Sequence, residues 1–340
     1  MIVDNNSKPA GFLDIPVPKD INLVQAINDL KKEKNAIILA HYYQESNIQD
    51  IADFVGDSLA LARWAAKTDA DIIVLCGVDF MGETAKILSP EKRVFVPDLN
   101  AGCSLADSCP ADEFEKFIQA HPEHTVICYV NTSAAIKVLT DVVVTSSNAR
   151  QIVDNFPADA KLIFAPDRNL GNYINSVTGR NMVLWDGACH VHEQFSLEKI
   201  IELKKQYPNA LVLAHPECKS AVLKVADYIA STSGLLEYAS TSGLLEYASC
   251  SDKKEFIVAT ESGILHEMRN KNPEKVFIPA PPNDSTCACN ECNFMRLNTM
   301  EKLYNCLKYE IPEIFIDDDT IEKAVKPINK MLELSEKMGL

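Results

Sequence analysis

The sequence lacks the segments that would carry a protein into or across a membrane. None of its 340 residues belongs to an uninterrupted apolar run near the roughly 18 residues that a transmembrane helix needs. The first residues, MIVDNNSKPAGF, contain no basic flank followed by an apolar stretch, so they do not resemble a secretory signal peptide. We therefore expect a cytoplasmic protein with no membrane partner.

Positive charge is also scarce. The chain has 33 Lys and Arg residues against 48 Asp and Glu residues, which gives a formal net charge of −15. Nucleic acids and anionic lipid surfaces repel a strongly acidic protein, so we expect no nucleic-acid partner. An anionic substrate would have to be bound by local groups such as helix N-termini, because the overall field opposes its approach.

Cysteine, by contrast, is plentiful. Eleven cysteines in a chain without an export signal do not indicate a disulfide framework, because a reducing compartment keeps thiols reduced. We expect them to be buried apolar residues, metal ligands or nucleophiles. The remaining composition, 47% hydrophobic and 24% charged, is ordinary for a globular protein of two or three domains.

Short apolar runs rich in β-branched residues alternate with helical patterns along the whole chain. Such runs, separated by amphipathic segments like residues 58–67, are typical of buried strands in the parallel sheets of an α/β fold. The strand-like runs include residues 36–40, 72–76, 125–130, 162–165, 210–214 and 256–259.

The runs form three units of four strands each. Asp53, Asp141 and Asp227 hold corresponding positions, 88 and 86 residues apart. Any α/β chain spaces its strands evenly, but here the polar residues after the strands correspond as well. We therefore predict three αβα domains related by pseudo-threefold symmetry, with short parallel sheets around one central active site. The predicted domains cover residues 21–104, 105–190 and 191–293, and C-terminal helices within 294–340 are expected to pack back on the first.

Polar residues end the predicted strands and recur at the same intervals. His41, Tyr129 and His215 form one series. Because ligands bind at the carboxyl ends of parallel strands, we expect these residues to surround one site. Hydroxyl groups at such positions either cap the following helix or help to bind an anion, and the two roles are compatible. The hydroxyl series with the same spacing is Ser58, Ser146 and Thr232.

Each unit also closes with a strand followed by cysteine. Cys103 and Cys189 are 86 residues apart, which is one repeat step, and the third unit ends in a C-x-C-x2-C run at 287–292. Soft thiolates from three distant segments suit an iron–sulfur cluster. Three ligands instead of the usual four would leave one iron open to act as a Lewis acid, which favours dehydration chemistry. The run at 287–292 alone could also hold zinc.

The other cysteines have less distinctive surroundings. Apolar neighbours predict core positions for Cys76, Cys128 and Cys306. Cys218 is expected to lie near the site without being a ligand. The roles of Cys109, Cys287 and Cys289 stay open, and a reversible disulfide between Cys287 and Cys289, or of one of them with Cys292, is an alternative.

Many segments match, in order, the motifs of one known family. They include AHYYQ (40–44), GDSLALAR (56–63), CGVDFMGETAKILSP (76–90), AGCSLADSCP (101–110), YVNTSAAIK (129–137), TSSNA (145–149), GACHVHE (187–193), HPEC (215–218), VATESGILHEM (258–268) and CNECNFMRLN (289–298). On these segments the chain resembles the quinolinate synthases, from about residue 21 to the last helix. The resemblance implies a pseudo-threefold fold around a [4Fe-4S] cluster.

The resemblance also implies an activity. Members of this family are transferases that condense iminosuccinate with dihydroxyacetone phosphate, release phosphate and water, and form quinolinate for NAD biosynthesis. An aspartate-oxidising enzyme would supply the iminosuccinate. Two alternatives are another cluster-dependent hydro-lyase acting on a small carboxylic acid, and a non-catalytic zinc or redox-sensing protein.

Site residues follow from the resemblance motif by motif. Cys103, Cys189 and Cys292 would ligate the cluster, and Tyr43 with Glu217 would form the acid/base pair. Two histidines, His192 and His215, would complete the catalytic group. The residues implied for substrate binding are His41, Ser58, Tyr129, Asn131, Ser146, His215, Ser231 and Thr232.

One feature departs from the family pattern, in which we expect a single copy of the segment STSGLLEYA. Here residues 231–239 recur unchanged as residues 240–248. The repeat interval favours the first copy, so Ser231 and Thr232 are expected at the site and at the start of the next helix. We expect a break or a surface excursion near residues 240–243, because Ser, Thr and Gly form helices poorly.

Overall fold

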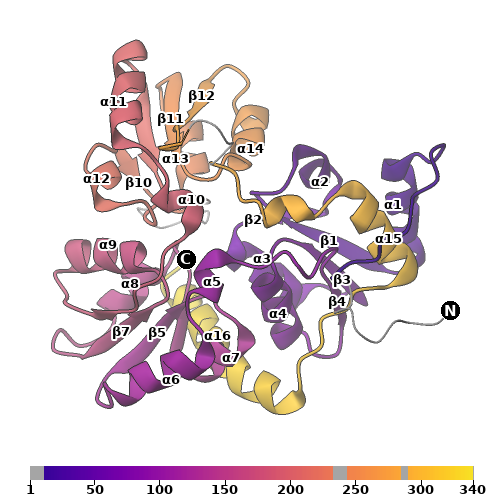
Figure 1. Cartoon of the computed structure of the whole chain (residues 1–340), viewed down its shortest axis with the longest axis horizontal. Coiled ribbons are helices and arrows are strands. Elements are labelled where there is room, and N and C mark those ends of the chain that lie inside the picture. Colours follow the sequence, from indigo (N-terminus) through magenta and orange to yellow (C-terminus); the bar gives the residue numbers. More distant parts are fainter. Residues whose placement is uncertain (1–10, 233–242, 285–289, 340) are drawn as a thin grey trace.

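The computed structural model describes residues 11–232, 243–284 and 290–339. It has three lobes, each built on a four-stranded parallel sheet with flanking helices (Figure 1). The strand orders are β2-β1-β3-β4, β6-β5-β7-β8 and β10-β9-β11-β12, so the three units share one topology. The predicted α/β fold of three αβα units is confirmed.

In the first unit, every residue of β3 is buried, as its unbroken apolar sequence predicts. The amphipathic segment at 58–67 forms α3, whose first turn is capped by the Asp57 side chain accepting a hydrogen bond from Ala60 N. The elements are α1 (Leu23–Glu33), β1 (Ala36–His41), α2 (Ser46–Ile51), β2 (Phe54–Gly56), α3 (Ser58–Lys67), β3 (Ile72–Cys76), α4 (Asp79–Leu88) and β4 (Arg93–Phe95).

The second unit has the same strand order, and its first three strands in the chain are largely apolar and buried. Its elements are α5 (Ser104–Asp107), α6 (Ala111–Gln119), β5 (Thr125–Tyr129), α7 (Ala134–Val138), β6 (Val142–Val144), α8 (Ala149–Asp154), β7 (Leu162–Ala165), α9 (Arg168–Thr178) and β8 (Val183–Leu184).

The third unit and the C-terminal helices complete the described chain. Their elements are α10 (His190–Glu193), α11 (Leu197–Gln206), β9 (Leu211–Ala214), α12 (Ser220–Leu223), β10 (Tyr228–Ile229), α13 (Leu244–Cys250), β11 (Glu255–Ala259), α14 (Ile264–Lys271), β12 (Val276–Pro279), the 3-10 turn η1 (Met295–Leu297), α15 (Met300–Tyr309) and α16 (Asp318–Lys337).

The aspartate series that revealed the repeat has the same structural role in each unit. Each aspartate directly precedes the second strand and accepts a hydrogen bond from a backbone N–H of the first strand, while its own N–H donates to the carbonyl of that same residue. This pair of hydrogen bonds fixes the register of two strands that a helix separates in sequence. The carboxylate bonds are Ile38 N to Asp53 (2.7 Å), Val126 N to Asp141 (2.8 Å) and Val212 N to Asp227 (2.8 Å).

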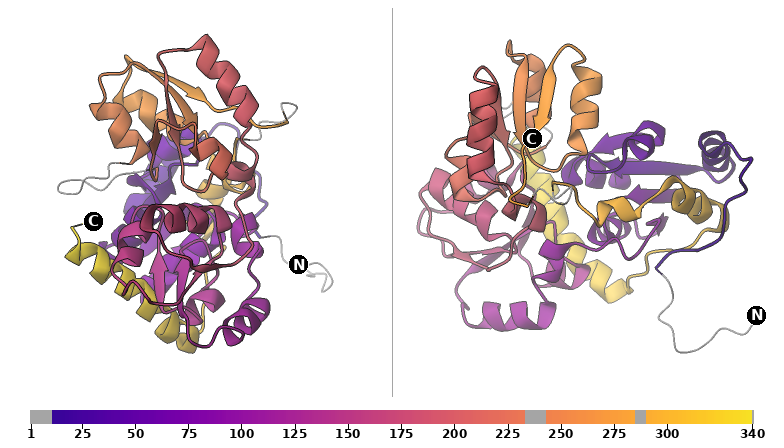
Figure 2. Two further views of the ribbon diagram at one scale, coloured as in Figure 1. Left: turned by 90° about the vertical axis from the view of Figure 1, so that its left-hand side faces the viewer. Right: turned by 45° about the horizontal axis from the view of Figure 1, so that its top comes forward.

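The C-terminal helices pack on two different units (Figure 2). Helix α15 lies against α1 and buries Leu303 and Leu307 in the first unit's core. Helix α16 contacts α7 and β6 of the second unit as well as α4 of the first, because Ala324, Ile328 and Met331 form one apolar stripe that both units cover. Helix α15 thus packs on the first unit, whereas α16 packs on both the first and the second.

The duplicated segment supplies its strand end and its helix from different copies. Ser231 and Thr232 of the first copy follow β10, whereas α13 begins at Leu244 of the second copy. Leu244 N donates to the Ser231 carbonyl at 2.8 Å, and Leu245 N lies 3.3 Å from the Thr232 carbonyl. The expected helix start within the first copy, and most of the expected excursion at 240–243, fall on residues 233–242, which lie outside the described residues.

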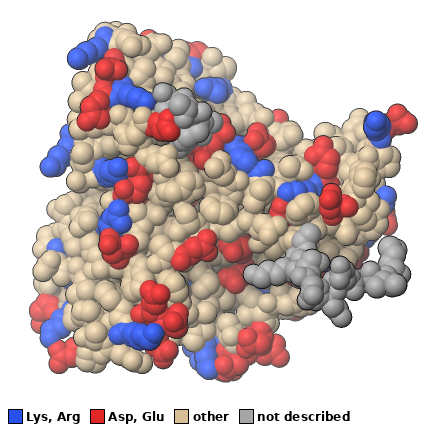
Figure 3. Space-filling view, viewed as in Figure 1, with Lys and Arg blue, Asp and Glu red and all other residues tan. Residues whose placement is uncertain are grey.

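Two general properties of the described residues concern the hydropathy of the helices and the charge of the surface. None of the described helices is both long enough and apolar enough to cross a membrane. Figure 3 shows Lys and Arg side chains interspersed with Asp and Glu over all three lobes.

We predict that deleting residues 233–241 leaves a folded protein. The deletion joins Thr232 to Ser242 and places Leu244 four residues after Ser231. The existing hydrogen bond from Leu244 N to the Ser231 carbonyl then has the i to i+4 spacing of an α-helix. The free energy of unfolding should stay unchanged or rise by about 1 kcal/mol, because a shorter connection costs less closure entropy. Thermal unfolding followed by circular dichroism measures this, and a melting temperature lowered by several degrees would contradict it.

Candidate active site

A cavity lies where the carboxyl ends of the three sheets meet. The short helices α5 and α10 begin directly after Cys103 and Cys189, and both lie near the middle of Figure 1. All the predicted site residues except Ser231 line this cavity. They are His41, Tyr43, Ser58, Cys103, Tyr129, Asn131, Ser146, Cys189, His192, His215, Glu217, Thr232 and Cys292.

Ser231 is the exception. It is buried, and its carbonyl oxygen accepts the hydrogen bond from Leu244 N that leads into α13. The neighbouring Thr232 supplies the hydroxyl-bearing side chain that lines the cavity. The structure therefore gives the two residues different environments, one in the wall behind the cavity and one at its surface.

One thiol from each unit reaches the cavity, and none of the three forms a disulfide. Burial raises the pKa of Cys103, Cys189 and Cys292. Neighbouring thiols raise the pKa of Cys103 and Cys189 further, and for Cys189 the Glu217 charge acts in the same direction. Thiolates would therefore be unfavourable here without a positive partner, which a metal centre supplies because it binds the deprotonated form. Three convergent soft ligands from three units fit an iron–sulfur cluster.

Among the described residues, the other cysteines do not line this cavity. Cys76, Cys128 and Cys306 are buried in apolar clusters, as the sequence predicts. Cys109 is buried in the core of the second unit, and the Cys218 thiol donates to the Ala259 carbonyl at 3.3 Å. The open alternatives for Cys287 and Cys289 concern residues outside those that the structure describes.

Glu217 lies at the centre of the polar network. Its Oε1 accepts a 2.7 Å hydrogen bond from the Tyr129 hydroxyl, and its Oε2 lies 3.2 Å from His192 Nδ1. His215 Nδ1 lies 3.6 Å from the same carboxyl group. Burial opposes the charge of this carboxylate, whereas its neighbours stabilise it, and the balance lowers the pKa of Glu217 to about 2. The cavity therefore holds a buried carboxylate in its ionised form.

Two histidines in repeat-related positions share one local motif. The Nδ1 atom of His41 accepts a hydrogen bond from Tyr43 N at 3.2 Å, and that of His215 accepts one from Glu217 N at 3.3 Å. Burial lowers the pKa of both imidazoles to about 3, although the Glu217 charge acts in the opposite direction. Both rings are thus neutral with the proton on Nε2, and His215 donates from Nε2 to Ser146 Oγ at 3.2 Å.

Thr260 joins the two members of the implied acid/base pair, and sequence reasoning missed it. Its hydroxyl oxygen lies 2.9 Å from the Tyr43 hydroxyl and 3.1 Å from His192 Nε2. Because His192 in turn faces Glu217, a continuous polar chain connects Tyr43 to Glu217 without direct contact between them. Burial and the Glu217 charge raise the pKa of Tyr43, so this phenol keeps its proton.

The cavity wall can accommodate an anion without a cationic side chain. None of the described lining residues is Lys or Arg. Since Asp57 caps α3, the neighbouring Ser58 has its hydroxyl at the cavity and is not the cap that we considered. Asn131 Oδ1 is buried with no hydrogen-bond partner among the described residues, which indicates a donor still to be supplied by a ligand.

Several further residues of the wall were not predicted. The polar ones stand beside predicted residues or end a strand, so their positions after apolar runs were the signal that could have found them. The apolar ones carry no such signal, because their sequence pattern is that of ordinary core residues. The unpredicted lining residues are Asp57, Val78, Phe80, Met81, Thr145, Val191, Glu261 and Met295.

A smaller metal site is also geometrically available. The ligand atoms of Cys189, His192 and Glu217 lie within 4.8 Å of one another, a set that would suit zinc. However, Cys103 and Cys292 line the same cavity, and a single zinc ion bound by this set would leave both of these thiols unused.

Comparisons with known proteins agree on one family. The model of the quinolinate synthetase A protein family matches residues 25–333. Proteins named quinolinate synthase from Thermosynechococcus vestitus and Chloroherpeton thalassium are 58% and 57% identical to the chain, over 94% and 93% of its length and 97% and 95% of theirs. One from Synechocystis sp. is 57% identical over 94% of this chain and 96% of its own. The chain therefore belongs to the quinolinate synthetase A protein family.

Proposed function

We propose that this chain is a quinolinate synthase that condenses iminosuccinate with dihydroxyacetone phosphate, with loss of phosphate and water, in NAD biosynthesis. The observation that carries the proposal is the convergence of three thiols, one from each unit, on a cavity that also holds the Glu217 network. Membership of the family over nearly the whole chain supports the same activity.

Cys103, Cys189 and Cys292 would hold a [4Fe-4S] cluster. A cluster bound by three cysteines has one iron without a protein ligand, and that iron supplies a Lewis acid for a substrate oxygen. The chain's own contribution is to keep this region closed. Val78, Met81 and other apolar residues of the wall limit the entry of water.

Both substrates are anions, and neutral donors would bind them. The Nε2–H groups of His41 and His215, the hydroxyls of Ser58 and Thr232, and the amide of Asn131 line one cavity. In a buried site such donors stabilise oxyanions strongly, because little water competes with them. Binding of this kind needs no Lys or Arg side chain, and none of the described lining residues offers such a cation to form an ion pair with the Glu217 carboxylate.

Proton transfers would be carried by the chain from Tyr43 to Glu217. Imine formation, tautomerisation and dehydration each require a base that removes a proton and an acid that returns one. The ionised Glu217 can accept a proton, and Tyr43, which keeps its proton, can donate one. Thr260 lies within hydrogen-bond distance of both Tyr43 and His192, and His192 Nδ1 lies 3.2 Å from Glu217, so these two residues form a path along which a proton can pass.

Iminosuccinate is an imine and hydrolyses in water, so the reaction needs a supply close at hand. We propose that an aspartate-oxidising enzyme in the same compartment, the cytoplasm, provides it. The second candidate function is that of a cluster-dependent hydro-lyase acting on a small carboxylic acid, which the same donors would bind. Incubating the anaerobically purified protein with iminosuccinate and dihydroxyacetone phosphate, followed by chromatography for quinolinate, distinguishes the two.

Replacing any one of the three convergent cysteines should remove the metal centre. We expect Cys103→Ala, Cys189→Ala and Cys292→Ala each to lose the brown colour and the activity, because two thiolates cannot hold a cluster of this kind. Cys76→Ala, at a buried core position, is the control and should keep both. Iron and sulfide are measured after anaerobic purification, and full cluster content in any of the three variants rules out that residue as a ligand.

Replacing the proton-transfer residues should leave iron and sulfide in place but slow turnover. Glu217→Gln and Tyr43→Phe are each expected to lower kcat by about 10²- to 10⁴-fold, the usual contribution of a general acid or base. Thr260→Val should fall in the lower part of that range, since it breaks the chain between them while retaining the volume. If kcat falls only about twofold in all three variants, other residues carry out the proton transfer.

Thr232 and Ser231 should differ in their effects on substrate binding. We expect Thr232→Ala to raise KM strongly and Ser231→Ala to change it less, because only the Thr232 side chain lines the cavity. The pair Ser240→Ala with Thr241→Ala, in the second copy of the duplication, serves as the control and should leave KM unchanged. Steady-state kinetics decides, and the reverse ranking would assign the contact to the second copy.

A further inference from the structure

Two units place a carboxyl group at the same point of their sheets. Ala165 and Ala259 are the last residues of the third strands that pair with the first strands. Asp167 and Glu261 each follow two residues later. In the first unit the equivalent position, two residues after Cys76, is held by Val78. The shared position in two units indicates a shared role that the first unit fills in another way.

In both units the carboxyl group reaches the backbone of a cysteine that lines the cavity. Asp167 Oδ2 lies 3.3 Å from Cys189 N, and Glu261 Oε1 accepts a hydrogen bond from Cys292 N at 3.0 Å. These cysteines are 22 and 31 residues further along the chain. A side chain at the end of the third strand thus holds a loop that the sequence places far away.

The second oxygen of each carboxyl group is anchored as well. Asp167 Oδ1 accepts from Leu170 N at 2.8 Å and so caps α9, while Glu261 Oε2 accepts from Gly263 N at 2.7 Å. Asp167 and Glu261 are 0% and 1% exposed, so neither can swing into solvent. Each carboxyl group is therefore a fixed bridge between the sheet and the cysteine loop.

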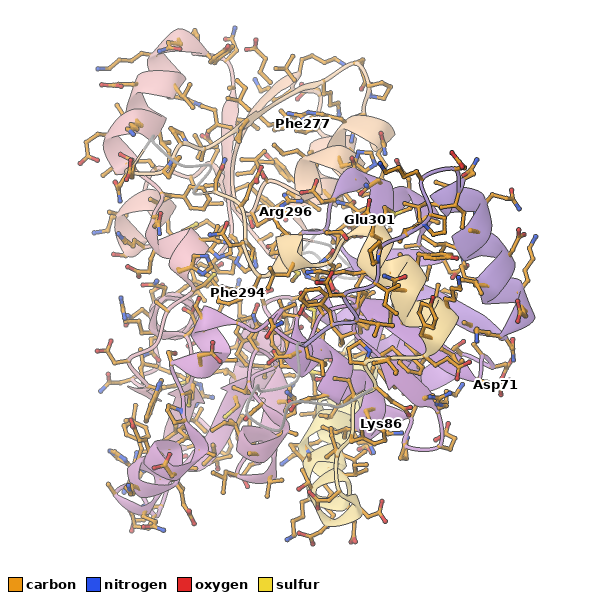
Figure 4. The ribbon with its side chains drawn as sticks, turned by 45° about the vertical axis from the view of Figure 1, so that its right-hand side comes forward. Asp71, Lys86, Phe277, Phe294, Arg296 and Glu301 are labelled. Atoms are coloured by element: carbon orange, nitrogen blue, oxygen red, sulfur yellow. The ribbon has the colours of Figure 1, made fainter. Side chains whose placement is uncertain are left out.

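In the third unit the bridge extends to the first unit. Arg296, labelled in Figure 4 on the segment that follows Cys292, lies with its Nη2 atom 3.3 Å from Glu261 Oε1. Its Nη1 atom lies 3.2 Å from Glu45 of the first unit. The Cys292 segment is thus held from both sides of the boundary between the two units.

The first unit has no equivalent carboxyl bridge among the described residues. Asp79 follows Val78, and its carboxylate accepts from its own neighbour, Phe80 N, at 2.7 Å. Its backbone N–H donates to the Ala101 carbonyl at 2.7 Å and so holds the loop that leads to Cys103. In the first unit a backbone hydrogen bond therefore holds the cysteine loop, whereas in the other two units a carboxyl side chain holds it.

We propose that Asp167 and Glu261 are positioning residues that hold Cys189 and Cys292 in the arrangement a cluster requires. The inference rests on the proposed cluster and deepens it. A ligand whose backbone is fixed returns to the metal after a transient dissociation, whereas a ligand on a loosened loop moves away. Residues that orient metal ligands in this way typically contribute about 10- to 100-fold to metal affinity.

The test is the rate at which the anaerobic holoenzyme releases iron to a ferrous chelator. Asp167→Ala and Glu261→Ala should release it about 10- to 100-fold faster than the wild type. Asp167→Asn and Glu261→Gln keep an oxygen acceptor for the cysteine N–H and should stay within about threefold. The matched control is Asp141→Ala, which removes the same kind of carboxylate-to-backbone bond far from any cavity cysteine and should release iron at the wild-type rate.

Folding and cluster assembly are checked separately. Circular dichroism shows whether each variant is folded; if Asp167→Ala is not, Glu261→Met, which retains the length but no strong acceptor, decides in its place. Wild-type release rates in the folded alanine or methionine variants would overturn the positioning role and leave the proposed function standing. A wild-type protein that binds no iron and sulfide would overturn both.

Discussion

Parallel strands deliver the polar residues that follow them to one edge of the sheet, and the rest of this structure depends on that constraint. One short sheet can present only a few such residues. By meeting at their carboxyl ends, the three sheets bring three small sets into a single cavity. The cysteines, the two motif histidines and Glu217 therefore face one another although they lie in different thirds of the sequence.

The chemistry of the cavity follows from how its one ionised carboxylate is stabilised. A buried charge without a partner would cost several kcal/mol. Glu217 accepts a hydrogen bond from the Tyr129 hydroxyl and lies 3.2 Å from His192 Nδ1, and none of the described lining residues is Lys or Arg. This arrangement keeps a base in a buried cavity and leaves the surrounding groups as neutral donors. The same donors can then face an anionic ligand without first being released from an ion pair.

The sequence predicted those features that depend on local pattern or on the repeat. The strand positions followed from apolar runs, and the interval between Asp53, Asp141 and Asp227 reflects a bond that each unit makes within itself. Cross-unit relationships were less accessible. Thr260 was overlooked because its importance arises only when Tyr43 and His192, from different units, approach it. The division of the duplicated segment between two copies was likewise hidden, since identical copies offer no sequence signal of which one is used.

The tautomers of His41 and His215 bear on which metals the cavity can accept. Each ring uses its Nδ1 lone pair for a backbone N–H and carries its proton on Nε2, so neither has a lone pair to offer. Zinc and copper ions favour sites in which imidazole nitrogen completes a set of thiolates. These two rings therefore offer no nitrogen to such ions, and of the described histidines that line the cavity only His192 remains as a possible ligand. The hydrogen bonds that the main chain makes to His41 and His215 thus favour the three thiols as the metal ligands of the cavity.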